Sequence, residues 1–221
     1  MRTFVLIPGA GGMAWNWHRV TPLLTSAGHQ AIAVDLPGDD DSAGLPEYAG
    51  IVTAAIGART DVVLVAQSLG GFTAPLVAER IPVRALVLVN AMIPVPGETP
   101  AAWGDHTGSS PARTDAAAGG GYSADFDEVT YFLHDVPASV IADGEGRQRS
   151  ESEAAFGSAC EFRAWPVPVR VVVGRDDRLF PASFQQRVAR DRLGVAADLL
   201  PGGHLIALSQ PDALARYLLA V

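Results

Sequence analysis

A serine in a run of small residues is the first candidate for chemistry in this sequence. Residues 61–71 are DVVLVAQSLGG, so an apolar run of strand type leads to Ser68 and glycines follow it. A strand that turns sharply into a helix here would hold the serine hydroxyl clear of the backbone, as in a nucleophile elbow. Such a turn needs small residues two before and two after the serine, and Ala66 and Gly70 supply them. Because a chain rich in glycine and alanine matches this pattern easily, Ser68 also needs partners elsewhere.

A serine hydroxyl becomes a good nucleophile only when a base removes its proton and a further group orients that base. Among the five histidines, His204 is the strongest candidate for the base. It follows the apolar run 196–200 and the Pro-Gly-Gly turn of residues 201–203. A histidine on such a loop lies at the carboxyl edge of a parallel sheet, within reach of a serine that ends an interior strand.

The other histidines are less suited to this role. His18 and His29 fall in or near the first predicted helix, where they are surface or core residues, and His106 falls in a low-complexity stretch. His134 lies in a segment that we expect to surround the substrate. We therefore predict His134 as a pocket residue and not as the base.

The group that orients the base is expected between Ser68 and His204, at the carboxyl end of another strand. Residues 171–181, VVVGRDDRLFP, supply Asp176 and Asp177 at such a place. The residues themselves leave both aspartates open, although an aspartate in a turn is often solvated.

Ester-type chemistry also needs donors for the negative oxygen that develops as the serine attacks. The N–H of Leu69, directly after the serine, is one candidate, because N–H groups at a helix start are unpaired. Ala10 in the loop 8–12, PGAGG, is the other, and Gly9 would let the backbone approach the charge closely.

Apolar runs and helical patterns alternate around these residues. The predicted strands are residues 3–7, 30–34, 62–66, 84–89, 169–173 and 196–200. The predicted helices are residues 15–24 (continued or restarted at Pro22), 48–58, 69–80, 182–193 and a last one from Pro211 with Ser209 as its cap. This alternation predicts an α/β fold with a parallel sheet and helices on both faces.

The alternation is interrupted between the fourth and fifth predicted strands. We expect residues 1–93 and 166–221 to form the core and residues 94–165 to form an inserted lid with most of the substrate pocket. Within it, residues 106–122 are predicted to be a mobile low-complexity loop, and residues 126–141 have helical character. Its aromatic residues are expected either to line the pocket or to pack inside the lid: Trp103, Phe126, Tyr131, Phe132 and Phe162.

Composition excludes several classes of function. The net charge is −8 and no basic cluster occurs, which argues against nucleic acid and anionic membranes as partners. All 16 basic residues are arginine, so Schiff-base, pyridoxal-phosphate and P-loop lysine chemistry are excluded. Cys160 has no cysteine to pair with and is expected to be a small buried residue. We expect no metal and no organic cofactor.

Membrane attachment and export are not indicated either. The apolar run at residues 3–7 is cut short by Pro8 and Gly9, and no run of about 18 apolar residues occurs. A cytoplasmic location is predicted, with the chain a monomer or homodimer.

The motifs together resemble the α/β-hydrolase superfamily, and within it the branch of plant-type methylesterases and hydroxynitrile lyases with their bacterial relatives. The resemblance covers nearly the whole chain. It rests on residues 4–10 (FVLIPGA), 14–17 (AWNW), 35–38 (DLPG), the elbow, 90–94 (NAMIP), 174–177 (GRDD) and 203–209 (GHLIALS).

This resemblance implies an α/β-hydrolase fold whose mostly parallel sheet has six strands, with the first two strands of the larger family missing. It implies a triad in the order Ser68, Asp177, His204, because the family's acid stands three residues after the glycine and four before the proline. The sequence departs from the usual pattern at Pro8, Ala66 and Gln67. None of these positions carries a group that does chemistry.

Two positions bear on the reaction. Lyases of this branch carry threonine where Gly9 stands and lysine after the histidine, where this chain has Leu205. Because cyanide release needs a cation near the leaving group, the resemblance disfavours a hydroxynitrile lyase. Dehalogenases and epoxide hydrolases are disfavoured as well, since they carry aspartate at the elbow.

The expected function is therefore hydrolysis of a small or medium apolar carboxylic ester through an acyl-enzyme intermediate. Ser68, His204 and Asp177 are the predicted triad, and Ala10 and Leu69 the oxyanion donors. The predicted pocket residues are Gly9, Trp103, Tyr131, His134 and Leu205. A lactonase, thioesterase or C–C hydrolase with the same triad, or a receptor-like binding protein with little turnover, remains open as an alternative.

Overall fold

A parallel β-sheet forms the centre of the molecule. The structure, a computed structural model, describes residues 1–165 and 167–221. The strands are β1 (Thr3–Ile7), β2 (Gln30–Ala33), β3 (Val62–Gln67), β4 (Ala85–Val89), β5 (Val169–Gly174) and β6 (Ala197–Leu200). They form one six-stranded sheet in the order β2-β1-β3-β4-β5-β6, and every neighbouring pair is parallel. The predicted α/β fold with six strands is confirmed.

The sequence of the inner strands explains their position. β1, β3 and β4 are apolar except for Thr3 at the start of β1 and Gln67 at the end of β3. They are buried along their whole length, as strands covered on both faces must be. Successive side chains of β1 alternate between two hydrophobic clusters: Phe4 and Leu6 pack on one side of the sheet, Val5 and Ile7 on the other. The outermost strands, β2 and β6, are only partly buried.

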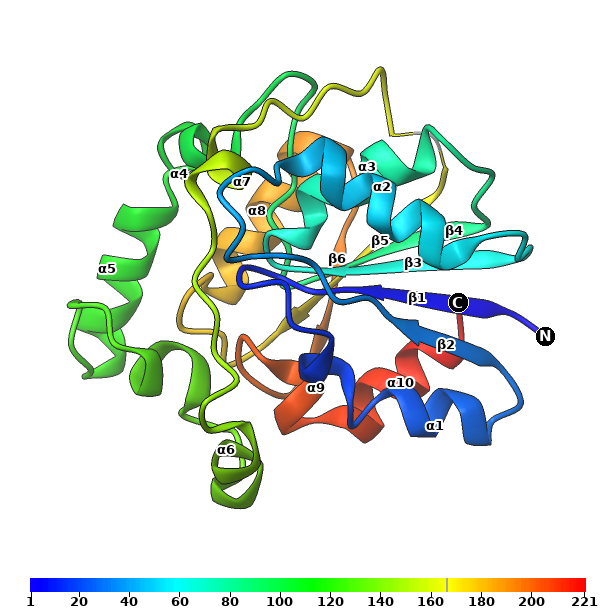
Figure 1. The fold of residues 1–221 in the computed structure, drawn as a ribbon. Coiled ribbons are helices and arrows are strands. Elements are labelled where there is room, and N and C mark those ends of the chain that lie inside the picture. Colours follow the sequence, from blue (N-terminus) through cyan, green and yellow to red (C-terminus); the bar gives the residue numbers. More distant parts are fainter. Residues whose placement is uncertain (166) are drawn as a thin grey trace.

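Helices cover both faces of this sheet (Figure 1). α2 (Leu45–Ile56), α3 (Gly70–Ala78) and α8 (Ala182–Leu193) lie on one face. α1 (Thr21–Ser26), the short α9 (Ile206–Ser209) and α10 (Pro211–Leu219) lie on the other. In the part of the chain that the structure describes, no helix has the length and apolar character needed to span a membrane.

The starts of α1 and α10 differ in detail from the prediction. The segment 15–24 is split into a 3-10 turn, η1 (Ala14–Trp17), and α1, whose first turn contains Pro22. Proline lacks the N–H that a helix interior needs, so the helix restarts there. The prediction of Ser209 as the cap of the last helix is wrong, because Gln210 holds that position and Ser209 ends α9.

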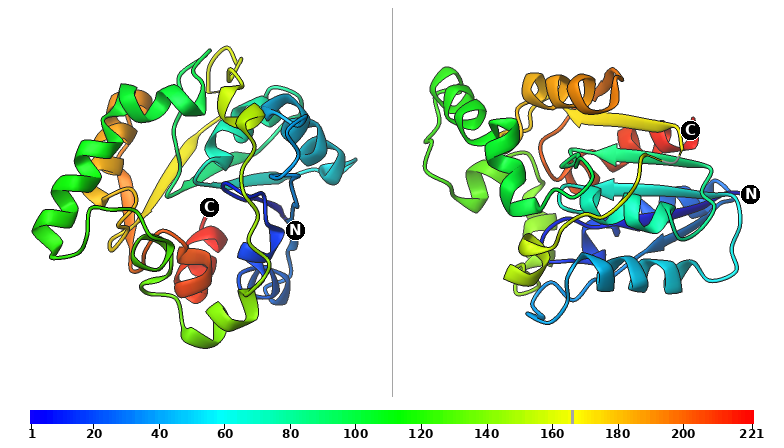
Figure 2. Two further views of the ribbon diagram at one scale, coloured as in Figure 1. Left: turned by 60° about the vertical axis from the view of Figure 1, so that its left-hand side comes forward. Right: turned by 90° about the horizontal axis from the view of Figure 1, so that it is seen from above.

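Residues 94–165, called the insertion below, lie between β4 and β5 in the sequence. They contain α4 (Pro100–Thr107), α5 (Ser109–Gly120), a π-helical turn η2 (Val129–Leu133), α6 (Ala138–Gly144) and α7 (Glu153–Gly157). Figures 1 and 2 show these elements gathered beyond the carboxyl ends of the strands, while both chain termini lie at the opposite edge of the sheet. The expected core boundary at residue 166 falls on the one position outside the described residues.

The prediction of a mobile loop at residues 106–122 is wrong. α5 occupies most of this stretch, between left-handed glycines at Gly108 and Gly121. Its interior holds a run of alanine, the residue with the highest helix propensity, and this outweighs the glycines at its end. The glycines thus mark the ends of a helix and not a continuous loop.

Candidate active site

Ser68 lies at a sharp turn between β3 and α3. Its φ of 51° is in the left-handed region, which a residue with a side chain rarely occupies. The two glycines that follow allow the turn to pack tightly. A Cβ on Gly70 would lie 2.5 Å from the carbonyl oxygen of Pro8, and one on Gly71 would overlap with the carbonyl oxygen of Met92. The local sequence therefore forms the strained strand-to-helix turn that it predicts.

The strand order places the glycine loop 8–12 beside this serine. β1 pairs with β2 on one side and with β3 on the other, so the connections that follow β1 and β3 lead toward opposite edges of the sheet. The loops after β1 and β3 therefore lie side by side at the carboxyl ends of these strands, where α/β sheets bind ligands. A Cβ on Gly9 would lie 2.8 Å from Cβ of Ser68, and the Gly9 N–H donates to Oε1 of Gln67 (3.1 Å).

His204 and Asp177 form a buried pair at the same edge. Nδ1 of His204 lies 2.9 Å from Oδ2 of Asp177, and both side chains are almost fully buried. Oδ1 of Asp177 accepts from the N–H groups of Leu179 and Phe180, each at 2.9 Å, and Oδ2 also accepts from Nε2 of Gln185 (3.0 Å). These contacts hold the carboxylate in one orientation against the imidazole.

The neighbouring Asp176 has a different environment. Its side chain is exposed, and Oδ2 accepts from the N–H of Gly202 at 3.2 Å. It therefore links the loop after β5 to the loop that carries His204 without contacting the imidazole. Of the two aspartates, the structure brings Asp177 to His204.

The second ring nitrogen of His204 is free. Nε2 is buried and has no hydrogen-bond partner among the described residues, Ser68 included. The imidazole lies edge-on between Phe132 and Phe180, with ring centroids 5.1 and 5.3 Å away. Both phenylalanines line the cavity that contains Ser68. In enzymes without ligand, the bond between nucleophile and base is often long and tightens only when substrate binds.

Two buried amide side chains fix the loop of His204, and sequence analysis missed their role. Nδ2 of Asn90, at the end of β4, donates to the carbonyl oxygens of Gly203 (2.9 Å) and His204 (3.0 Å). Its Oδ1 accepts from the N–H of Gly174 at 2.6 Å. Nε2 of Gln67 donates to the carbonyl oxygen of His204 at 3.4 Å. The positive φ of Asn90, 45°, parallels that of Ser68 one strand away.

Two N–H groups beside Ser68 are available for a ligand. Ala10 and Leu69 line its cavity, and neither N–H donates to any group in the described part of the chain. The next N–H, of Gly11, is already bound to Oε2 of Glu151 at 2.7 Å. This contact ties the glycine loop to the insertion. Burial raises the pKa of Glu151 despite the hydrogen bonds that it accepts from Tyr48 and the Gly11 N–H.

The cavity of Ser68 has a volume of about 380 Å³ and is mostly apolar. Core and insertion both contribute to it. Its lining comprises Ala10, Ser68, Leu69, Met92, Pro100, Ala101, Trp103, Gly104, Ser109, Arg113, Phe132, Phe156, Leu179 and Phe180. Arg113 is the one charged residue in this lining. It was not predicted as a pocket residue, because its segment was expected to be a loop.

The predicted pocket residues divide into two groups. Trp103 lines the cavity and Gly9 packs directly against Ser68. The other three lie elsewhere. Tyr131 is fully buried inside the insertion, where it stacks on Phe126, and His134 and Leu205 line separate cavities. Tyr131 and Phe132 are adjacent in η2, and it is Phe132 that lines the cavity of Ser68.

Comparison with known proteins agrees with this architecture. The sequence pattern described as "Alpha/beta hydrolase family" matches residues 4–217. "Probable esterase PIR7A" of Oryza sativa subsp. indica is 39% identical over 109 residues, which cover 43% of this chain and 41% of that protein. "Methyl jasmonate esterase 1" of Vitis vinifera is 36% identical over 108 residues, covering 43% and 41%. The matched segment thus covers 41% of the length of each of these two curated relatives.

Solved structures extend the likeness to the whole chain. The crystal structure of polyneuridine aldehyde esterase superposes with a TM-score of 0.79 at 22% identity, covering all (100%) of this chain and 98% of that one. Strand order, elbow and sequence pattern lead to the same conclusion, which agrees with the predicted resemblance. The chain belongs to the α/β-hydrolase family.

Proposed function

We propose that this protein is a serine hydrolase that cleaves a small or medium apolar carboxylic ester. Ser68 is the nucleophile, His204 the general base and Asp177 the residue that orients it. The observation that carries the proposal is the buried His204–Asp177 pair, 2.9 Å apart, at the sheet edge where Ser68 stands on a strained turn. Relatives described as esterases, such as the rice and grapevine proteins, support the same reaction class.

The reaction proceeds by acyl transfer. Oγ of Ser68 attacks the ester carbonyl while Nε2 of His204 takes the hydroxyl proton, and Asp177 stabilises the imidazolium that forms. The N–H groups of Ala10 and Leu69 bind the oxyanion, and such a donor is worth about 10²- to 10³-fold in rate. His204 returns the proton to the departing alcohol. Water, deprotonated by His204, then attacks the acyl-enzyme and releases the acid and Ser68.

The contacts of Gly9 favour hydrolysis over cyanohydrin cleavage. A Cβ there would lie 2.8 Å from Cβ of Ser68 and 2.6 Å from Oε1 of Gln67. The threonine of the resembling lyases would therefore require this loop to move. Leu205 supplies no cation next to the base, and the chain contains no lysine.

The insertion acts in this proposal as a lid. It supplies Trp103, Phe132 and Phe156 to the cavity, so the acyl or alcohol part of the substrate is held by apolar surface. The division into a core and a lid, the monomeric or homodimeric state and the cytoplasmic location stay predictions.

Turnover on a matched panel tests the proposal. Purified protein is assayed with short-chain nitrophenyl esters, aliphatic lactones and acyl thioesters, with Ser68→Ala as control. We expect the highest kcat/KM on simple esters and no turnover above background in Ser68→Ala. A preference for lactones or thioesters would replace the substrate class but keep the triad. Absence of turnover on every substrate would leave a binding protein and reject the enzyme.

A further inference from the structure

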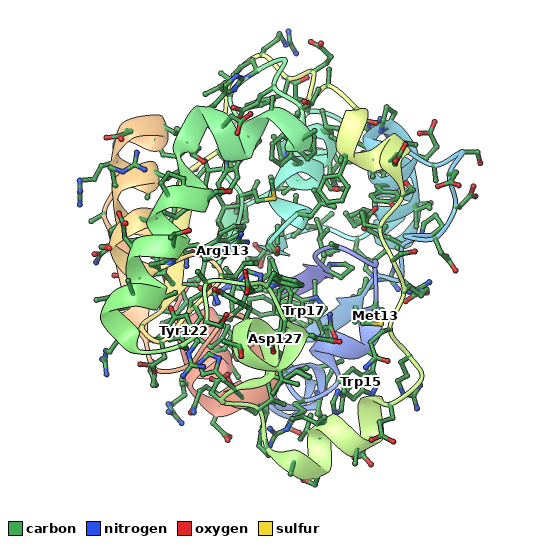
Figure 3. The ribbon with its side chains drawn as sticks, turned by 90° about the vertical axis from the view of Figure 1, so that its left-hand side faces the viewer. Met13, Trp15, Trp17, Arg113, Tyr122 and Asp127 are labelled. Atoms are coloured by element: carbon green, nitrogen blue, oxygen red, sulfur yellow. The ribbon has the colours of Figure 1, made fainter. Side chains whose placement is uncertain are left out.

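Arg113 places a positive charge in the cavity of Ser68. It comes from α5, and the lining around it is mainly apolar, with Ser109 as a neighbouring hydroxyl. Among the residues that line this cavity in the structure, none carries a carboxylate. In Figure 3, which views the molecule from the side of the insertion, Arg113 lies on the inner side of α5, toward the middle of this face.

The guanidinium has no anionic partner within the described part of the chain. Arg113 forms no ion pair there, and its Nε is buried without a hydrogen-bond partner. The guanidinium lies over the face of Tyr131, 5.5 Å from the ring centroid. By contrast, Arg149 in the same insertion pairs with Asp35 at 2.8 Å.

Arg113 is only partly buried, so water still reaches part of its charged side chain. Its Nε is nevertheless shielded from solvent without a hydrogen-bond partner among the described residues, and the cation–π contact offsets only part of that desolvation. The protein carries a net charge of −8, yet among the residues that the structure describes no acidic side chain forms an ion pair with this arginine. The missing partner is therefore most simply supplied by the ligand.

We propose that Arg113 binds a free carboxylate on the substrate, so that the preferred substrate is an ester that also carries an acid group. This inference rests on the proposed ester hydrolysis at Ser68. The planar guanidinium matches a carboxylate with two parallel hydrogen bonds, and the Ser109 hydroxyl is a further donor in the same lining. A single cation in apolar surroundings suits a monoanion better than a phosphate dianion. The mostly apolar lining of the cavity that Ser68 and Arg113 share suits an aliphatic or aromatic spacer between the ester and the acid group.

Pairs of substrates that differ only in this charge test the inference. Monomethyl esters of the dicarboxylic acids from succinic to suberic acid are compared with methyl esters of the monocarboxylic acids of equal length. For a carboxylate on the alcohol side, 4-acetoxybenzoate is compared with 4-methylphenyl acetate. The readout is the ratio of kcat/KM for the anionic and the neutral member. A charge-assisted contact predicts a wild-type ratio above 1 for at least one pair, and a fall of about 10- to 100-fold in Arg113→Gln.

Two further variants separate recognition from a general effect. Arg113→Lys keeps the charge without the planar pair of donors, so it should retain part of the preference. Arg163→Gln makes the same change in net charge on the insertion, where the side chain is 92% exposed, and should keep the wild-type ratio. A wild-type ratio at or below 1 for every pair, an equal loss on both members in Arg113→Gln, or the same loss in Arg163→Gln overturns the inference.

Binding distinguishes failure of this inference from failure of the proposed function. Suberate and 1,8-octanediol are titrated calorimetrically into wild type and Arg113→Gln. If wild type hydrolyses no ester, the proposed function fails, but suberate binding that Arg113→Gln loses still supports the carboxylate site. If wild type hydrolyses neutral esters and binds suberate no better than the diol, the proposed function stands and the carboxylate site is rejected.

Discussion

The carboxyl edge of the sheet and the insertion contribute to the same cavity in different ways. At the sheet edge, the groups proposed for chemistry are held by backbone. Ser68 is fixed by its strained turn, and Asp177 by two N–H groups and Gln185. In the insertion, short helices present aromatic side chains and the unpaired charge of Arg113.

This difference indicates a division of labour. Groups that must be positioned to within a fraction of an ångström are carried by the rigid sheet, while the surface that meets the variable part of a substrate is carried by connecting segments. Changes at the sheet edge should therefore lower kcat, and changes in the insertion should mainly raise KM. Glu151 connects the two regions, since it comes from the insertion and accepts a hydrogen bond from the Gly11 N–H of the glycine loop.

The two adjacent aspartates allow the largest predicted contrast within the sheet edge. Asp177→Asn removes the carboxylate that orients His204 and should lower kcat by about 10⁴-fold, as expected when the acid of a triad is lost. Asp176→Asn changes an exposed group that accepts a hydrogen bond from the N–H of Gly202 and does not contact His204, so kcat should stay within about threefold, as for surface substitutions. Steady-state kinetics on one nitrophenyl ester decides this. Equal losses in both variants would show that the triad acid is misassigned.

Gly9→Ala tests how closely the glycine loop must approach the serine. The added Cβ would lie 2.8 Å from Cβ of Ser68, so either the loop or the nucleophile must shift. A displacement of this size should lower kcat by about 10²-fold. Gly119→Ala is the matched control in the insertion, because a Cβ there meets nothing within 4 Å. If Gly9→Ala keeps wild-type kcat, the loop does not form the oxyanion site.

Much of the sheet edge was predictable, because three of the strand-like runs in the sequence are each followed within about four residues by a residue able to do chemistry. Ser68, Asp177 and His204 all follow such runs, and parallel strands bring their carboxyl ends to one edge. Asn90 and Gln185 were not recognised as supports. Their partners are set by the adjacency of β4 and β5 and by the packing of α8, which the linear sequence does not display.

The insertion was predicted less well. Its local pattern of glycine, alanine and proline suits both loops and short helices, so α5 was expected to be a loop. Without a helix there, no argument could place Arg113 on an inward face. The aromatic residues were expected near the pocket, but which of Tyr131 and Phe132 lines it depends on the π-helical turn η2.

Phe156→Ala should show the behaviour of the insertion. The side chain lines the cavity and is 36% exposed, so its removal costs little core packing. Loss of its apolar contact should raise KM for a neutral aromatic ester by about 5-fold, with kcat nearly unchanged. Phe126→Ala, an exposed aromatic of the same insertion that does not line this cavity, is the control. A fall in kcat without a rise in KM would contradict the division between the two regions.

Glu151→Gln tests the link between the regions through pH. Burial raises the pKa of the Glu151 carboxyl above its ordinary value of 4.5. The folded state therefore binds this proton more tightly than the unfolded state, and unfolding free energy falls as pH rises from 4.5 through the raised pKa.

The variant lacks this titration. The Tm of Glu151→Gln minus that of wild type should therefore increase between pH 4.5 and neutral pH, measured by calorimetry. A difference that stays constant over this range would show that the Glu151 carboxyl is not held in a buried link.

The most direct test of the central claim is covalent labelling of wild type and Ser68→Ala with a fluorophosphonate, followed by intact mass and peptide mapping. The proposed acyl-transfer site predicts one adduct per chain, located on Ser68, with loss of ester hydrolysis in step with labelling. Ser68→Ala should take up no label. No adduct in wild type, an adduct on another residue, or undiminished hydrolysis by Ser68→Ala would contradict the assignment of Ser68 as the nucleophile.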